Sequence, residues 1–302
     1  MYISDLQKRK IKEEDNVTKK EKNGRLGLTV YRTICYIVLI LITILCLFSF
    51  YILLINSTRN HTQILKGFSV VPGKSLVNNF KHLMSNPNLP VVKGMMNSFF
   101  VAASSAILTT YFSSLTAYAI HAYDFKAKKA IFTFILMIMM VPTQVSALGF
   151  IKLVIRLDLM NSFIPLIIPG IAAPIVFFFM KQYMDSSLPL EIIEAARIDG
   201  SSEFRLFNTI VLPIMKPAIA VQMIFAFTSS WNNYFIPSLI INQKDKKTLP
   251  ILIAQLRSAD FLRFDYGQVY MLIALSIFPV IVIYLILSRN IVQGIAIGSV
   301  KG

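Results

Sequence analysis

The sequence predicts an all-α, polytopic membrane protein with six transmembrane helices, and three observations support this prediction. First, 55% of the 302 residues are hydrophobic and only 15% are charged, which exceeds the apolar content of a soluble domain of this length. Second, six apolar segments reach the length of about 20 residues that a helix needs to cross roughly 30 Å of hydrocarbon. Third, basic residues are concentrated immediately before the first of these segments, which is typical of a cytoplasmic flank.

Residues 1–30 form a basic tail that precedes the first apolar segment. The first 25 residues contain eight Lys or Arg residues, so we predict that the N-terminus is cytoplasmic. The apolar run that follows is longer than the core of a signal peptide, and no small-residue cleavage motif comes after it, so we expect an uncleaved membrane anchor. Aromatic residues do not alternate with the basic ones, and nucleic-acid binding is therefore not expected.

The transmembrane domain is expected to cover residues 31–290, with its core at about 90–290. An even number of spans returns the C-terminus to the cytoplasm, so that the loops 56–93 and 242–266 face outward in the lipid bilayer. We place the spans at residues 33–55, 94–120, 130–151, 159–180, 214–241 and 267–288.

The spans offer no obvious source of energy for transport. Away from their ends they contain no Asp, Glu, Lys, Arg or His, and basic residues such as Lys129, Lys152 and Lys181 lie at the edges. Proton- and ion-driven pumps generally need such groups inside the membrane, although some carriers bind sodium through neutral oxygens. The segment Gly67–Ser75 resembles a phosphate-binding loop, but five residues separate its glycines instead of four, and Pro72 has no N–H to donate. We therefore expect no nucleotide site in this chain.

No pattern in the sequence indicates catalysis or metal binding. His61, His82 and His121 lack the spacing of metal ligands, and the acids of the outer loops form no carboxylate pair. A membrane enzyme acting on lipid-linked sugars is therefore the weaker hypothesis. We predict no catalytic residue, no metal site and no cofactor bound by this chain.

A charged segment interrupts the apolar sequence between the fourth and fifth spans, on the predicted cytoplasmic side. Pro189 can begin a helix, apolar residues follow at spacings of three and four, and Gly200 can take the left-handed conformation that ends it. A second short helix should follow and end before Pro213. The expected result is a pair of helices over residues 189–211 that presents Glu194 and its neighbours at the membrane surface.

This segment resembles a known family signature. The motif Glu-Ala-Ala, three residues, Gly, nine residues and Ile-x-Leu-Pro, over residues 194–213, is similar at every position to the signature of binding-protein-dependent ABC importer permeases. The resemblance implies a type I ABC importer transmembrane domain, in which this segment is the coupling helix that binds a separate ATPase subunit. The residues that it assigns to ATPase coupling are Glu194, Ala195, Ala196, Arg197, Asp199 and Gly200.

From about Pro90 to the C-terminus, the chain is similar to the second permease subunit of carbohydrate importers of the maltose and multiple-sugar type. The resemblance is carried by segments such as NSFFVAASSAILTTYFSSLTAYAI, WNNYFIPSLI and the terminal QGIAIGSVKG. It implies a cytoplasmic, Gly-rich tail over residues 291–302 that reaches the ATPase subunits. The tail residues that it assigns to this contact are Gly294, Gly298, Lys301 and Gly302.

The same resemblance implies the partners, the location and the function. The partners would be a second permease in a heterodimer, two ATPase subunits that use ATP and Mg, and an extracellular solute-binding protein. The location would be the plasma membrane of a bacterium, with both termini cytoplasmic. The implied function is the permease subunit of an ATP-driven sugar importer. The alternatives are an importer of the same architecture for glycerol-phosphate or another non-sugar solute, and an ion-driven carrier.

The expected substrate path lies at the end of the fifth span. Trp231, Asn232 and Asn233 combine an aromatic ring with two amides, which suits a neutral polyol. The second span is rich in small hydroxyl residues, which we interpret as positions of close helix packing. These residues are Ser104, Ser105, Thr109, Thr110, Ser113, Ser114 and Thr116.

Overall fold

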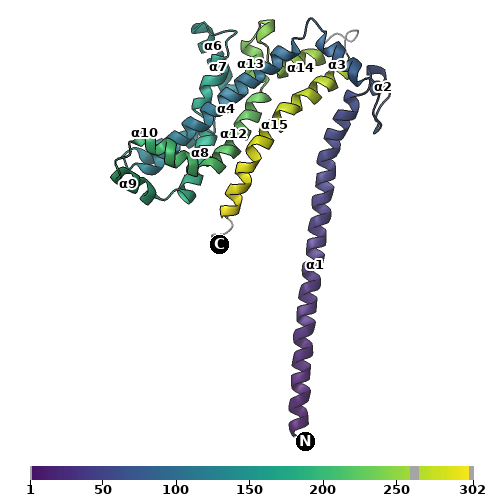
Figure 1. Cartoon of the computed structure of the whole chain (residues 1–302), viewed down its shortest axis with the longest axis vertical. Coiled ribbons are helices and arrows are strands. Elements are labelled where there is room, and N and C mark those ends of the chain that lie inside the picture. The colour runs from purple at the N-terminus through teal and green to yellow at the C-terminus, as the bar shows by residue number, and fades with distance from the viewer. Residues whose placement is uncertain (1, 259–264, 299–302) are drawn as a thin grey trace. The chain divides into compact units, whose positions relative to one another are not determined.

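The computed structural model describes residues 2–258 and 265–298, and these residues form helices, turns and loops without a strand. The chain divides into two compact units (Figure 1). The first contains residues 1–55 and 69–72, and the second contains the rest of the chain.

The first unit consists mainly of the long helix α1 (Tyr2–Ser57), whose last two residues already belong to the second unit. The stretch Leu28–Ser57 has a mean hydropathy of 3.0 in its most apolar window and is long enough to cross a bilayer. Nearly all of its large apolar side chains are exposed, as expected for a helix that is solvated by lipid. The expected basic tail and the first span therefore form one continuous helix in this structure.

The second unit contains the remaining helices of the described chain (Figure 1). Helix α4 packs against α8 and α12, and α15 packs against α12 and α3. The elements are α2 (His61–Leu65), α3 (Leu76–Met84), α4 (Val91–Ala122), α5 (Lys128–Ile138), α6 (Thr143–Arg156), α7 (Ile164–Ile167), the 3₁₀ helix η1 (Ile168–Ile171), α8 (Pro174–Ser187), α9 (Leu190–Ile198), α10 (Glu203–Leu206), the π-helix η2 (Phe207–Val211), α11 (Leu212–Ile214), α12 (Lys216–Trp231), α13 (Phe235–Ile240), the 3₁₀ helix η3 (Lys244–Lys246), α14 (Leu249–Arg257) and α15 (Tyr266–Gly298).

Six membrane spans are consistent with the structure, although two of them are bent. Among the described residues, four helical segments are long and apolar enough to cross a membrane, and two bent pairs raise the number to six. In one pair α5 and α6 meet at 96°, so the prediction of one uninterrupted helix over residues 130–151 was wrong. Pro142 explains the break, because the residue before a proline is driven out of the helical conformation.

The second bent pair begins in the charged segment. The helix that was expected to end before Pro213 continues through η2 and α11 to Ile214, and the chain then turns by 82° into α12. The wide turn of the π-helix just before Pro213 accommodates a residue that has no N–H. The bend follows at Met215 because the ring of Pro217 would collide with the carbonyl of residue 213 in a continuous helix.

Two hydrophobic cores lie toward opposite ends of α4. One packs the C-terminal half of α4 against α8, α9, α10 and η2, and includes Tyr118, Ile193 and Phe207. The other packs the N-terminal half of α4 against α3, α12, α14 and α15, and includes Ala106 and Trp231. In Figure 1, α9 and α10 lie at the end of this unit that is remote from α13 and α14. The charged segment is therefore fixed to the bundle at one end of α4.

Candidate functional site

Helix α9 exposes one face and buries the other. Ile193 and Ala196, three residues apart, are both buried in the core with α4 and α8. On the opposite face Glu194 and Ala195 are exposed, and the side chain of Ile198 is 86% exposed. This face of α9 therefore presents an acidic, a small and a large apolar side chain outside the bundle.

Gly200 ends α9 in a defined geometry. Its φ of +78° lies in the left-handed region, as the sequence predicted. The N–H of Ser201 donates to the carbonyl of Ala196, and the N–H of Gly200 donates to the carbonyl of Arg197. These two bonds form a Schellman motif, which satisfies the last carbonyls of the helix and turns the chain toward α10. The bend between the two helices is therefore built into the backbone.

A polar contact joins α9 and α10 to α4. Arg197 Nε donates to Glu203 Oε1 at 2.6 Å, and the hydroxyl of Tyr118 donates to Glu203 Oε2 at 2.6 Å. The guanidinium of Arg197 also lies over the ring of Tyr123, 4.9 Å from its centroid. The hydrogen bond to Glu203 raises the pKa of Arg197 above its ordinary value, so this side chain is charged. Glu203 therefore joins Arg197 on α9 to the buried Tyr118 on α4.

Glu203 and Tyr118 are functional candidates that the sequence did not reveal. Tyr118 lies within an apolar span, 85 residues before Glu203, so no local pattern connects them. The order of charges did offer one signal, since Arg197 and Glu203 flank the turn at Gly200 and opposite charges near a turn can pair. A parallel contact joins α4 to α8, where Asp185 lies 2.9 Å from His121 Nδ1 and accepts from Lys181 at 2.6 Å.

The other predicted coupling residues are placed as follows. Ala196 is buried, whereas Asp199 caps the C-terminus of α9 and is exposed. Gly294 and Gly298 lie in the last turns of α15, which extends ten residues past the predicted end of the sixth span. The expected tail is therefore helical as far as Gly298. Lys301 and Gly302 lie outside the described residues.

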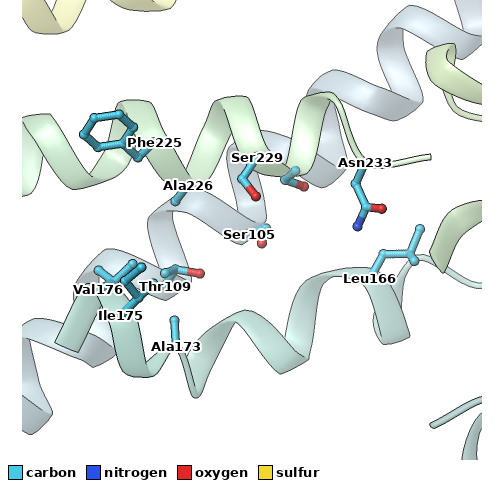
Figure 2. Close-up of a pocket in the computed structure, with 11 residues that line it drawn as sticks. Ser105, Thr109, Leu166, Ala173, Ile175, Val176, Phe225, Ala226, Ser229 and Asn233 are labelled. Carbon is cyan, nitrogen blue, oxygen red and sulfur yellow. The ribbon is translucent and has the colours of Figure 1, made fainter. Parts of the chain in front are cut away.

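A cavity of about 270 Å³ with a mixed polar and apolar lining lies where α4, α8 and α12 come together. It is partly open and contains no charged side chain in its lining. Figure 2 shows Ser229 and Asn233 from the α12 side directed into the space that Ser105 and Thr109 of α4 border. The lining residues are Ser105, Thr109, Leu166, Ala173, Ile175, Val176, Phe225, Ala226, Ser229, Ser230 and Asn233.

Of the three residues predicted for the substrate path, Asn233 lines this cavity. Trp231 is instead 3% exposed, stacks on Phe227 and donates its Nε1–H to the carbonyl of Ser276. Asn232 is exposed and does not line the cavity. In the second span, Ser105 and Thr109 line the cavity rather than acting only as packing positions. Among the described residues, no group of three His, Cys, Asp or Glu side chains is arranged to hold a metal ion.

The chain matches a known protein family over most of its second unit. Residues 109–297 match the family described as the binding-protein-dependent transport system inner membrane component. The chain belongs to this family. It is an ABC importer permease subunit and a multi-pass membrane protein.

Similar curated proteins are permeases of the same architecture. The arabinooligosaccharides transport system permease protein AraQ of Bacillus subtilis is 34% identical over 281 residues, which cover 91% of this chain and 97% of that protein. The lactose permease LacG of Rhizobium radiobacter is 30% identical and covers 88% of this chain and 95% of its own length. The sn-glycerol-3-phosphate permease UgpE of Yersinia pestis is 29% identical over 90% of this chain and 97% of that protein.

A solved structure supports the fold. A chain of a bacterial ABC transporter involved in the import of the acidic polysaccharide alginate superimposes with a TM-score of 0.73. The match covers 86% of this permease and 96% of that chain, at 18% sequence identity. This identity is low, so the likeness concerns the arrangement of helices and not the solute.

Proposed function

We propose that this permease is the second membrane subunit of an ATP-driven importer of neutral saccharides. It forms the translocation path with a different permease and is coupled by α9 to a separate ATPase dimer. An external binding protein delivers the sugar. The observation that carries the proposal is the exposed face of α9, which is held rigidly by the Schellman motif and by the contact of Arg197 and Tyr118 with Glu203.

The composition of the α9 face suits a protein groove. Ala195 permits close approach, Ile198 supplies an apolar anchor, and Glu194 supplies a charge that a basic residue of the ATPase can pair with. Gly294, Gly298, Lys301 and Gly302 are proposed to contact the ATPase subunits as well. The nucleotide and Mg would be bound by the ATPase, and this chain would carry neither a cofactor nor a catalytic residue.

The test of this coupling is a charge reversal on α9. We expect Glu194→Lys to leave the permease in the membrane but to reduce recovery of the ATPase, identified by mass spectrometry, with the affinity-tagged chain. The matched control is Asp124→Lys, which reverses an exposed acid in the loop between α4 and α5. Equal ATPase recovery and equal uptake in both variants would exclude α9 as the coupling helix.

A neutral sugar is the proposed solute because the cavity is lined by hydroxyls and an amide without a charged group. Two of the similar permeases carry names that refer to arabinooligosaccharides and lactose. An anionic solute is the second candidate, since another similar permease is named for sn-glycerol-3-phosphate. Burying that phosphate would require positive charges from the other permease, because an unpaired charge in the membrane costs several kcal/mol. Labelled uptake of both solute classes distinguishes the candidates.

The proposed location is the plasma membrane of a bacterium, with both termini in the cytoplasm. The cluster of basic residues before the first span supports this orientation. In this orientation α9 would lie on the cytoplasmic side, where an ATPase can reach it. Residues 56–93 and 242–266 would face outward, where the external binding protein can contact them.

A further inference from the structure

We propose that Ser105, Thr109, Ser229, Ser230 and Asn233 form a contact site of this subunit for the hydroxyl groups of the transported sugar. We call these five residues the hydroxyl wall. The inference rests on the proposed function and deepens it, because it assigns recognition of the solute to particular side chains of this permease. Four observations support it.

The first observation is the hydrogen bonding of the hydroxyl groups along α4. Thr110 donates to the carbonyl of Ala106 at 2.8 Å, Ser114 to that of Thr110 at 2.7 Å, and Thr116 to that of Phe112 at 2.9 Å. Such bonds to the preceding turn are the usual way in which a membrane helix satisfies a hydroxyl. The five side chains of the hydroxyl wall make no hydrogen bond to any other described residue and line the cavity, whereas Ser113 Oγ on α4 is also without a partner but does not line it.

The second observation is burial. Thr109 is 5% exposed and Ser105 is 9% exposed, so both are more than nine-tenths buried. A buried hydroxyl without a partner destabilises the fold, and Thr110 and Ser114 on the same helix avoid this by bonding to the backbone. Both residues line the cavity, and their hydroxyls can find partners there. A solute with many hydroxyl groups supplies such partners.

The third observation is convergence from separate helices. Ser105 and Thr109 are one turn apart on α4 and therefore project from the same face. Ser229 is on α12 and Asn233 lies two residues past the end of this helix, and Figure 2 shows both directed toward the space that Ser105 and Thr109 border. Gly170 in η1 allows this approach, because a Cβ at that position would lie 2.6 Å from Thr109 Oγ1 and 3.0 Å from Ser105 Oγ.

The fourth observation is the chemistry of the lining. The four hydroxyls both donate and accept, and the amide of Asn233 offers two donors and an acceptor. The remaining lining residues are apolar, including Phe225 and Ile175, and can contact the C–H face of a sugar ring. Formal charges are absent from the lining, so the cavity favours an uncharged polyol over an anion.

The experiment compares sugars that lack single hydroxyls. The assembled importer, with its binding protein in excess, is placed in vesicles and supplied with radiolabelled lactose, arabinotriose and their monodeoxy analogues at saturating concentrations. Thr109→Val and Asn233→Leu remove one polar group each at nearly constant volume. We expect each variant to lower the maximal uptake of the parent sugar about three- to ten-fold, as the loss of one hydrogen bond predicts.

The decisive readout is discrimination between sugars. If Thr109 bonds to a sugar hydroxyl, Thr109→Val should transport the parent sugar and one monodeoxy analogue at equal rates, whereas the wild type should prefer the parent. The matched control is Thr116→Val, which makes the same change at an exposed α4 residue that bonds to its own helix. This control should keep wild-type rates and preferences. Ser229→Ala, at an exposed position, provides the same test if Thr109→Val reduces the amount of assembled importer.

The possible outcomes test the hydroxyl wall and the proposed transport function separately. Uptake of a neutral sugar with unchanged rates and preferences in Thr109→Val, Asn233→Leu and Ser229→Ala overturns the hydroxyl wall and leaves the sugar importer standing. Failure of the wild type to take up any neutral sugar, together with uptake of labelled sn-glycerol-3-phosphate, overturns the proposed solute and the hydroxyl wall with it. Loss of discrimination confined to the cavity variants supports both.

Discussion

Gly200 is required for its backbone conformation and not for lack of space. Its φ is +78°, and a Cβ built on it would meet no atom within 4 Å. A residue other than Gly costs roughly 1–2 kcal/mol in the left-handed region, although Asn tolerates it better. We expect Gly200→Ala to loosen the end of α9 and to lower ATP-coupled uptake, while Gly200→Asn retains most of it. Uptake per ATP hydrolysed by the assembled importer measures the effect.

A wild-type coupling ratio in Gly200→Ala would contradict this account, because Ala removes no contact and adds no collision. A larger residue would not make the test sharper, since its side chain would also enter the surface that faces the ATPase. The Asn variant therefore serves as the control for conformation alone.

At the scale of single residues, the sequence was most informative where the local backbone geometry alone determines the role of a residue. The left-handed turn at Gly200 follows from residue type and position, and the structure confirms it. The roles of the hydroxyls in the second span could not be read in the same way. Thr109 and Thr110 are neighbours of the same type, yet one lines the cavity and the other bonds to Ala106. Which of them faces α12 depends on tertiary packing.

The Tyr118–Glu203 contact joins α4 to α10. Tyr118→Phe keeps the ring in the core and removes only the hydroxyl that donates to Glu203 at 2.6 Å. Hydrogen bonds to charged groups contribute about 1.5–3 kcal/mol, and the partial exposure of Glu203 reduces this to about 1 kcal/mol. We expect amide hydrogen exchange in α9 and α10 to become about five-fold faster.

Tyr111→Phe is the matched control for that measurement. Tyr111 is also on α4, and its hydroxyl makes a longer, neutral bond of 3.3 Å to Asn208 in η2. It should change exchange in α9 much less than Tyr118→Phe does. Equal effects of the two variants would show that the rings, and not the carboxylate contact, fix α9.

Elements were predicted well where apolar periodicity continues and poorly where a proline interrupts it. The single apolar run over residues 130–151 hides the break at Pro142, because hydropathy records composition and not direction. At Pro213 the error was the opposite one, because a helix was expected to end where it in fact continues. The π-helix η2 precedes this proline and widens the helix there. Both prolines can be read from the sequence, but whether a proline breaks a helix depends on the conformation of the neighbouring helical turns.

At the scale of the whole molecule, the permease should depend on partners for energy. The segment that resembles a phosphate loop forms a structural turn near Gly73, whose N–H donates to Thr58 Oγ1 at 2.7 Å. A Cβ on Gly73 would lie 2.5 Å from the carbonyl oxygen of Thr58, so little room remains for a phosphate. We expect the purified chain to hydrolyse no ATP and to bind none in equilibrium dialysis. ATP turnover by the isolated chain, lost in a Gly73 variant, would contradict the need for an ATPase partner.

The topology predicts opposite labelling of two loops. In the proposed orientation Lys66 lies in an outward-facing loop and Lys126 in a cytoplasmic loop, and both side chains are exposed. With Cys35 and Cys46 replaced, we expect Lys66→Cys to react with a membrane-impermeant maleimide in intact cells and Lys126→Cys to react only after the membrane is opened. The reverse pattern would invert the assigned orientation.

That the chain is a membrane permease could be predicted from its composition and from one motif, because both can be read without knowing which residues are in contact. The hydropathy predicted a helical membrane protein, and the signature over residues 194–213 predicted an importer permease. The family match agrees with this prediction. The cavity could not be predicted at that scale. Its residues come from α4, α7, α8 and the end of α12, and only the packing of these elements brings them together.

The absence of internal hydrogen bonds from the five side chains of the hydroxyl wall has an evolutionary consequence. Ser105 and Thr109 are buried and packed close to Gly170, but Ser229 and Asn233 are exposed, so replacement of these two side chains should cost the fold little. The face of α9 is remote from them in sequence and is fixed by different contacts. Under the proposed function, point mutations at Ser229 and Asn233 would alter the preference for a solute and leave α9 unchanged.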